Sequence, residues 1–396
     1  MFEKLKSTQP LIASEIEESI RSNTFSASSL YCGNEYSSKM TAAIETAKAL
    51  SCHEEGLKDC TCPSCVNFNN LTMQNVVIVS NRNYGTRIKA AVERFIQLRS
   101  DFSKQYLIET VRILLLSYHS CLYTDKNKAL FTAAYNANDM LIEFSYHKEP
   151  YKINEAKRFT KSLLATMKPL LDQDKKNLTN LSVDAVRNLQ LWVGQTKIKD
   201  KAKVIIIEGI EKSNDSVRNS LLKILEEPGE GTYFILLSSN PGRIMKTILS
   251  RVRRYYFPPI QKSLQIEMIR PFQIEDSSVD TFEKFFLSCG GFKETEYEDY
   301  LNQIVESFYD RSKELSLEEI WKFCILFDKT EQSDYILKIL VDKIERAFIE
   351  NKISATDARA LVKIINEDSI GYKVFNISKK NFFESLYRKL LGVIGD

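Results

Sequence analysis

A loop at 33–40 has part of the pattern that binds a nucleotide phosphate. Such a loop needs glycines where the backbone approaches phosphate, a lysine to balance the charge, and a Ser or Thr hydroxyl for magnesium. Gly33 and Lys39 supply the first glycine and the lysine. Ser38 replaces the second glycine, and Met40 replaces the hydroxyl although a thioether does not bind a hard cation. The pattern predicts a degenerate phosphate loop; an ordinary loop before a helix is the alternative.

The apolar run KVIIIEG at 203–209 carries the acid that such a site would use. Working enzymes of this type place two acids in succession after the strand, one to hold magnesium and one to polarise water. Here Glu208 is followed by Gly209, which has no side chain to polarise anything. We therefore predict a degenerate nucleotide site of Gly33, Lys39 and Glu208 that does not hydrolyse ATP. Weak nucleotide binding is compatible with what remains.

Four of the eight cysteines lie within 14 residues, at Cys52, Cys60, Cys62 and Cys65. The spacing from Cys62 to Cys65 is that of a zinc knuckle, and zinc takes four thiolate or imidazole ligands in a tetrahedron. Only one residue separates Cys60 from Cys62, so His53 is an alternative ligand to Cys60. We predict a structural zinc site, and buried or free thiols are the alternative.

Three short apolar runs predict buried strands of a parallel sheet, at 75–80, 203–209 and 232–239. Helical segments at 41–50 and 215–227 alternate with them. Strands that alternate with helices are typical of βαβ units, which bring the carboxyl ends of the strands to one edge.

Helical periodicity accounts for most of the remaining chain. Apolar spacings of three and four residues predict an all-helical block at about 86–178, and Pro258-Pro259 predicts a hinge. Beyond the hinge, segments at 315–327 and 334–351 again have helical spacing. The chain is therefore expected to consist of an α/β part with a helical insertion, followed by helices.

The segment 203–257 resembles bacterial DNA clamp loader subunits of the AAA+ class. Three pieces occur in the order and spacing of that family: SLLKILEEP (220–228), FILLSSNPGRI (234–244) and TILSR (247–251). Among DNA polymerase III clamp loader subunits, the damaged loop and the missing acid are similar to the delta-prime type, because the gamma/tau type keeps intact motifs. The cysteine cluster also lies where bacterial loader subunits carry a zinc module.

The resemblance implies an α/β fold of a definite kind. It would be an AAA+ P-loop type parallel sheet with helices on both faces, followed by a small helical lid domain and an all-α collar domain. The base domain would cover 1–258, with the zinc module at 52–65 and the helical insertion at about 86–178. The lid domain would cover 259–312 and the collar domain 313–396.

The resemblance also implies a role for Arg251. Ser250-Arg251 matches the family's SRC motif, with Val252 in place of the cysteine. In that family this arginine reaches the ATP of the neighbouring subunit, where a guanidinium stabilises charge on the transferring phosphoryl group. Arg251 is thus implied to be an arginine finger acting in trans. From the residues alone, the alternative is an arginine that ends a helix and pairs with a carboxylate.

The implied function is that of a non-hydrolysing subunit of the DNA polymerase III clamp loader. It would complete the ring that opens the sliding clamp and loads it onto primed DNA. Its partners would be the gamma/tau ATPase subunits, the delta subunit, the sliding clamp and, through the assembled complex, primer–template DNA. It would belong to a DNA-directed DNA polymerase holoenzyme and its clamp-loading ATPase without independent catalysis. The alternatives are a divergent but active gamma/tau-type ATPase subunit and a zinc-containing nucleic-acid-binding protein.

Composition and charge fit a cytoplasmic assembly subunit. The 396 residues suffice for two or three domains, and 27% charged residues is ordinary for a soluble protein. We expect no membrane partner, because no apolar run is long enough to span a bilayer and the N-terminus lacks an apolar signal core. The net charge of +3 argues against a long basic arm. The basic cluster KIKDKAK at 197–203 is short and mixed, which argues against a dedicated nucleic-acid binder.

Overall fold

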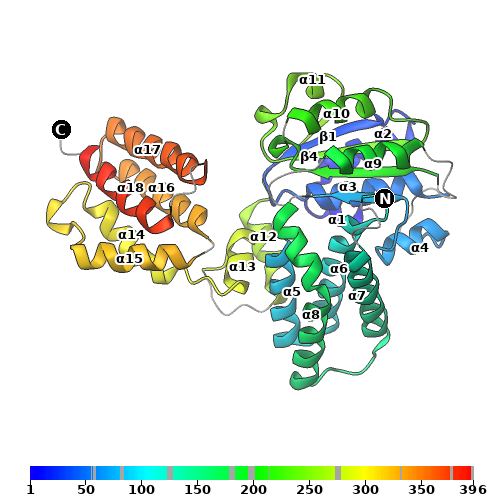
Figure 1. Cartoon of the computed structure of the whole chain (residues 1–396), viewed down its shortest axis with the longest axis horizontal. Helices are drawn as coiled ribbons and strands as arrows, with labels where there is room; N and C mark the ends of the chain where they lie inside the picture. The colour runs from blue at the N-terminus through cyan, green and yellow to red at the C-terminus, as the bar shows by residue number, and fades with distance from the viewer. Residues whose placement is uncertain are drawn as a thin grey trace. The chain divides into compact units, whose positions relative to one another are not determined.

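The computed structural model describes residues 1–54, 56, 59–80, 84–122, 128–177, 183–194, 201–213, 215–272, 278–330, 332–374 and 378–393. Most of the basic cluster at 197–203 lies outside these residues. The chain forms two compact units, Met1–Gly290 and Gly291–Asp396 (Figure 1). The lid and collar boundaries expected at 259–312 and 313–396 stay predictions.

A five-stranded parallel sheet forms the centre of the first unit, with strand order β2-β3-β4-β1-β5. The strands are β1 (Ser28–Gly33), β2 (Val76–Val79), β3 (Lys203–Glu208), β4 (Thr232–Ser238) and β5 (Arg253–Phe257). The three strands predicted from apolar runs are β2, β3 and β4. The other two strands were not predicted from the sequence, because β1 begins with two serines and the edge strand β5 begins with two arginines.

One face of the sheet packs against the amino-terminal helices. These are α1 (Glu3–Lys6), α2 (Pro10–Arg21) and α3 (Lys39–Ser51). Tyr31, Ile78 and Ile206 share a buried cluster with Leu5 of α1 and Ile16 of α2. These strand side chains belong to one face because successive residues of a strand alternate between the two faces.

The opposite face packs against three other helices, α9 (Val183–Gly194), α10 (Asp215–Glu226) and α11 (Lys246–Leu249). Leu30, Ile205 and Leu236 share a buried cluster with Leu189 of α9 and Leu221 of α10. Figure 1 shows α10 and α3 on opposite sides of the strands. The predicted α/β fold, a parallel sheet with helices on both faces, is confirmed.

Four long helices lie in the chain between β2 and α9. They are α5 (Tyr84–Leu98), α6 (Asp101–Leu115), α7 (Lys128–Tyr146) and α8 (Ile153–Asn177). Phe95, Val111, Leu141 and Leu163 belong to a buried cluster that these helices share. The all-helical block expected at about 86–178 is therefore a bundle with a core of its own, placed beside the sheet (Figure 1).

Two short helices follow the sheet, α12 (Lys262–Ile269) and α13 (Phe282–Cys289). They rest on the bundle, because Phe272 and Phe285 share a buried cluster with Ala90 of α5 and pack against Tyr106 of α6. The rings of Phe272 and Tyr106 are 4.8 Å apart in a T-shaped arrangement. The helical bundle thus supports the segment that follows the sheet.

The second unit is helical throughout its described residues. Its long helices are α14 (Thr295–Glu306), α15 (Leu317–Lys329), α16 (Ser333–Ile349), α17 (Ala355–Val374) and α18 (Lys379–Val393). Leu301, Phe323, Leu340 and Leu386 are fully buried in its own core. No helix among the described residues is both long enough and apolar enough to cross a membrane.

Candidate functional site

Gly33 ends β1 at a point where no side chain fits. A Cβ there would lie 2.4 Å from the carbonyl oxygen of Phe257 and 2.7 Å from Ser37 Oγ. Ser38, which replaces the second glycine, has a φ of 64°, in the left-handed region that glycine adopts most easily. Its hydroxyl accepts a hydrogen bond of 3.0 Å from Thr8 Oγ1. Ser38 thus occupies a backbone conformation in which glycine would be unstrained.

Lys39 and Met40 begin α3, and both are buried. Lys39 Nζ donates hydrogen bonds to the carbonyl oxygens of Gly33 and Asn34 and lies 3.4 Å from Ser37 Oγ. The oxygens of the loop itself thus surround the ammonium that would otherwise meet phosphate. Met40 is 6% exposed and belongs to the cluster that packs on the sheet. The position of the magnesium hydroxyl is therefore part of the hydrophobic core.

Glu208 ends β3 and accepts a hydrogen bond of 2.6 Å from Ser80 Oγ. Ser80 follows the neighbouring strand β2, a partner that the sequence reading missed although adjacent strand ends could have indicated it. Gly209 comes next with a φ of 76°, and its N–H donates to the carbonyl oxygen of Leu237 at 2.9 Å. The backbone at the missing second acid is thus in a conformation that side chains disfavour.

A further acid, Glu211, lies at the same edge of the sheet and was not singled out from the sequence. One of its carboxylate oxygens accepts a hydrogen bond of 3.1 Å from the N–H of Ser239, which follows β4. Its other oxygen, Oε2, is buried and has no hydrogen-bond partner among the described residues. A buried carboxylate oxygen usually has a partner, so Glu211 is the acid at this edge with capacity for one more interaction.

The tip of the loop contacts two other parts of the unit. The ring of Tyr36 stacks on that of Phe286 in α13, with 5.8 Å between centroids and 16° between planes. The guanidinium of Arg87 in α5 lies 4.5 Å from the Phe286 ring and 5.6 Å from the Tyr36 ring. Arg87 also pairs with Glu35 at 3.7 Å. This stack, which we call the loop clamp, joins the phosphate loop to the bundle and to α13.

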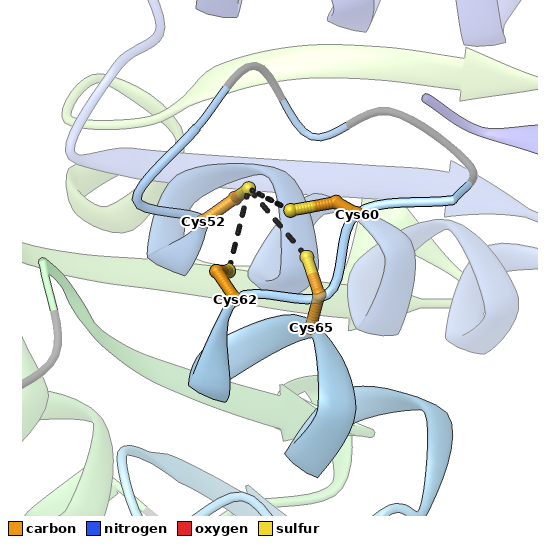
Figure 2. A group of neighbouring side chains, drawn as sticks. All are labelled: Cys52, Cys60, Cys62 and Cys65. Atoms are coloured by element: carbon orange, nitrogen blue, oxygen red, sulfur yellow. Dashed lines mark hydrogen bonds between the residues drawn. The ribbon is translucent and has the colours of Figure 1, made fainter.

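The four cysteines Cys52, Cys60, Cys62 and Cys65 converge between α3 and α4 (Pro63–Asn69), as Figure 2 shows. Cys52 follows α3 directly, Cys62 precedes α4, and Cys65 lies in the first turn of α4. All four sulfur atoms lie within 4.8 Å of one another, and Cys52 Sγ is 3.5, 3.7 and 3.8 Å from those of Cys65, Cys60 and Cys62. His53, the alternative ligand, is not part of this group.

The sulfur geometry fits a tetrahedral zinc ion. With Zn–S bonds of about 2.3 Å, the ligand sulfurs of a tetrahedron are about 3.8 Å apart. Burial opposes ionisation of Cys62, but hydrogen bonds from the backbone of His53 and Cys65 outweigh it and lower the Cys62 pKa to about 6. Burial raises the pKa of Cys65. The set offers four thiol ligands and no acid, which suits a closed structural site more than a catalytic one.

Arg251 follows α11 and pairs with Glu226, the last residue of α10. Its Nε donates a hydrogen bond of 2.6 Å to Glu226 Oε1, and its Nη1 donates one of 2.6 Å to the carbonyl oxygen of Thr247. The side chains of Arg251 and Glu226 are 31% and 47% exposed. The carboxylate pairing that the residue types allowed is therefore present, and the guanidinium stays at the surface. Val252 beside it is buried in the core.

Arg251 and the phosphate loop lie at opposite edges of the sheet. In the parallel register of β1 and β5, Ser29 faces Arg253 and Gly33 faces Phe257. Arg251, two residues before β5, is therefore at the amino edge, whereas Gly33 and Glu208 are at the carboxyl edge. A strand of this length separates the edges by about 15 Å. Of the predicted site residues, the structure brings together the four cysteines, joins Lys39 to Gly33 by a hydrogen bond, and places Arg251 apart from that loop.

The family described as "DNA polymerase III, delta subunit" matches residues 8–130 and 119–261, more than half of the chain. The chain belongs to this family. The match spans both the sheet and the helical bundle, and it ends near the Pro258-Pro259 hinge. The comparison thus supports the clamp loader resemblance read from the sequence.

Individual relatives are similar over part of their length. The chain is 28% identical over 178 residues to the DNA polymerase III subunit delta′ of Haemophilus influenzae, covering 42% of the chain and 52% of the relative. It is 25% identical over 213 residues to that of Buchnera aphidicola subsp. Schizaphis graminum, covering 52% and 61%. The subunit tau of Bacillus subtilis is 37% identical over 82 residues, covering 21% and 15%. The chain thus spans less than two thirds of these relatives.

Proposed function

We propose that the chain is a delta-prime-type subunit of the DNA polymerase III clamp loader that hydrolyses no ATP itself and supplies Arg251 to the ATP of a neighbouring subunit. In this role it completes the loader ring together with the gamma/tau ATPase subunits and the delta subunit. The ring would open the sliding clamp and load it onto primer–template DNA. The relatives whose names carry delta′ support this proposal.

The separation of Arg251 from its own loop carries the proposal. An arginine about 15 Å from the carboxyl edge cannot reach a phosphate bound at Gly33, so it is available only to a nucleotide on another chain. The ion pair with Glu226 is half exposed, and such pairs contribute roughly 0–1 kcal/mol. Arg251 would therefore lose little free energy on leaving Glu226 for a phosphate oxygen. The new contact would be a charge-assisted hydrogen bond, which a guanidinium forms well.

The state of the loop supports the absence of hydrolysis. Lys39 is bound by loop carbonyl oxygens, Met40 lies in the core, and Gly209 has no side chain. Phosphoryl transfer needs magnesium and an oriented water, each worth orders of magnitude in rate. A site that lacks both groups is therefore expected not to hydrolyse ATP.

The test is clamp- and DNA-stimulated ATP hydrolysis by a loader reconstituted with its ATPase partner and this chain carrying Arg251→Ala. We expect hydrolysis to fall by about 10³-fold or more at the affected site, the size typical of an arginine finger, while the complex still assembles. Arg251→Lys should not rescue it, because a lysine lacks the planar fork. Arg243→Ala, an exposed arginine eight residues away, is the matched control. Unchanged hydrolysis by Arg251→Ala would refute the role.

A divergent but active ATPase of the gamma/tau type is the second candidate, favoured by Glu211 and by the similarity to a subunit tau. In that case Glu211, with its unpartnered Oε2, would take over from the missing acid. The isolated chain would then hydrolyse ATP, and both Lys39→Ala and Glu211→Gln would abolish the activity. Absence of hydrolysis by the isolated wild-type chain excludes this candidate.

The cysteine group would hold a structural zinc ion in either candidate. It closes the turn between α3, which begins at the phosphate loop, and α4. A bound ion would fix the carboxyl end of α3 and supply folding free energy instead of chemistry.

A further inference from the structure

The helical bundle concentrates the positive charge of the chain. Residues 84–177 contain 16 lysines and arginines against 10 aspartates and glutamates, a net charge of +6, whereas the whole chain has a net charge of +3. The rest of the chain is therefore net negative. A local excess of this kind raises the concentration of polyanions at one surface, even in a protein of nearly neutral overall charge.

Much of this charge is exposed on one face of α8. Lys157, Arg158, Lys161 and Lys168 are all exposed. With 3.6 residues per turn, these four positions fall within an arc of about 100° around the helix axis. The opposite face packs into the bundle core through Leu163 and other apolar residues, namely Ala156, Met167 and Leu170. We call the four exposed cations the α8 basic face.

The four cations make no ion pair with another described residue. Glu155, the acid in the first turn, accepts a hydrogen bond of 2.9 Å from the backbone N–H of Lys152 instead. Asp172 is the one other acid of α8 whose side chain is described, and it lies a turn beyond Lys168. On other exposed helices, basic residues do pair with acids one turn away, as Lys322 does with Glu318. The α8 basic face thus keeps its charge available to a partner.

The helix that carries these cations is held firmly. The rings of Phe144 in α7 and Phe159 in α8 stack at 4.2 Å, and Tyr118 donates a hydrogen bond of 2.6 Å to the carbonyl oxygen of Leu170. Figure 1 shows α8 alongside α5 and α7. A rigid helix presents its charges without an ordering cost for the backbone, so more of the electrostatic attraction remains as binding free energy.

We propose that the α8 basic face binds the phosphate backbone of double-stranded DNA without reading its sequence. From Lys157 to Lys168 the face extends about 16 Å along the helix, and a duplex presents one negative charge per about 1.7 Å of its axis. Among the side chains on the arc there is no aromatic ring, and binders of single strands rely on such rings for stacking. The chain belongs to a DNA polymerase III family. Double-stranded DNA is therefore the polyanion that we expect this face to meet.

The α8 basic face does not take part in the role proposed for Arg251, and the two can fail independently. The test uses the full chain and a short labelled DNA duplex, with binding followed by fluorescence anisotropy over a range of salt concentrations. The variant is Lys157→Gln/Lys161→Gln/Lys168→Gln. We expect its Kd at low salt to rise at least about tenfold. The slope of log K against log salt should become shallower by about 3, since each neutralised phosphate adds about 0.9 to that slope.

A matched variant removes the same charge from the second unit, as Lys313→Gln/Lys329→Gln/Lys363→Gln. Its Kd should stay within about twofold of the wild type and its salt slope should not change. Circular dichroism of both variants checks that α8 and the helices of the second unit remain folded. Two results would overturn the proposal: equal weakening by both variants, or wild-type binding only to an acidic peptide and not to the duplex.

Discussion

At the scale of single residues, the loop at 33–40 begins with a glycine that its neighbours require. Gly33 is fixed by close contact with Phe257 and Ser37. Gly33→Ala should therefore lower the free energy of unfolding by about 1–3 kcal/mol, as overpacking against backbone does. Urea unfolding measures this, with Gly194→Ala as the control, since a Cβ at Gly194 meets no atom of the described residues within 4 Å. A loss no larger than that of the control would show that β5 yields easily at Phe257.

The cysteine group gives a second prediction at this scale. Purified chain should contain about one zinc ion per molecule by mass spectrometry of the metal. Cys60→Ser and Cys65→Ser should each lose the ion and lower the melting temperature, because binding free energy is folding free energy at such a site. Cys121→Ser, a half-buried cysteine away from the group, should keep it. Retention of full zinc by Cys60→Ser would point to His53 as the fourth ligand.

At the scale of elements, the loop clamp couples three segments that are distant in sequence. Because Arg87 and Phe286 are in contact, the losses of unfolding free energy caused by Arg87→Ala and Phe286→Ala should not be additive. A double-mutant cycle in urea should give a coupling free energy of about 0.5–2 kcal/mol. Phe348 lies in the second unit. The effects of Arg87→Ala and Phe348→Ala on the free energy of unfolding should therefore be additive within about 0.5 kcal/mol. Additivity in both cycles would mean that the stack contributes nothing to stability.

The elements that the sequence predicted well are those with strong periodicity. The strands β2, β3 and β4 are continuous apolar runs, and the bundle helices have apolar residues three and four apart, so both were found. The strands β1 and β5 were missed, because polar residues at their starts hide the pattern. The placement of Arg251 and Gly33 at opposite edges of the sheet could not be predicted from the spacing of residues in the sequence. It depends on β5 pairing with β1, a long-range contact that places Arg251 away from Gly33.

The same limit applies to the contacts made by side chains. Motif spacing was enough to predict that the four cysteines come together, because their positions are local in sequence. Ser80 and Glu211 were missed, because each makes its hydrogen bond to a residue at the end of a neighbouring strand. The α8 basic face was also missed, since its four cations are interleaved with apolar and uncharged polar residues along the chain. The four cations come to lie together only when the turn of the helix places them on one side of α8.

At the scale of the whole molecule, the second unit has a core of its own. A fragment of residues 291–396 should therefore fold alone, with helical circular dichroism and a single cooperative urea transition. Leu386→Ala, at a fully buried position, should reduce the stability of the fragment by about 2–5 kcal/mol. Lys363→Ala, at an exposed position, should change it by no more than about 0.5 kcal/mol. A fragment without a cooperative transition would show that this core needs the first unit.

The φ of 76° at Gly209 bears on the evolutionary routes open to this chain. A single mutation to aspartate there would restore the missing acid only in a strained backbone, at a cost of about 1–2 kcal/mol. A hydroxyl restored at Met40 would meanwhile leave a cavity in the core beside α3. Each of the two substitutions made alone should therefore lower the free energy of unfolding. In the role proposed for this chain, a gain of hydrolysis would therefore require both substitutions together.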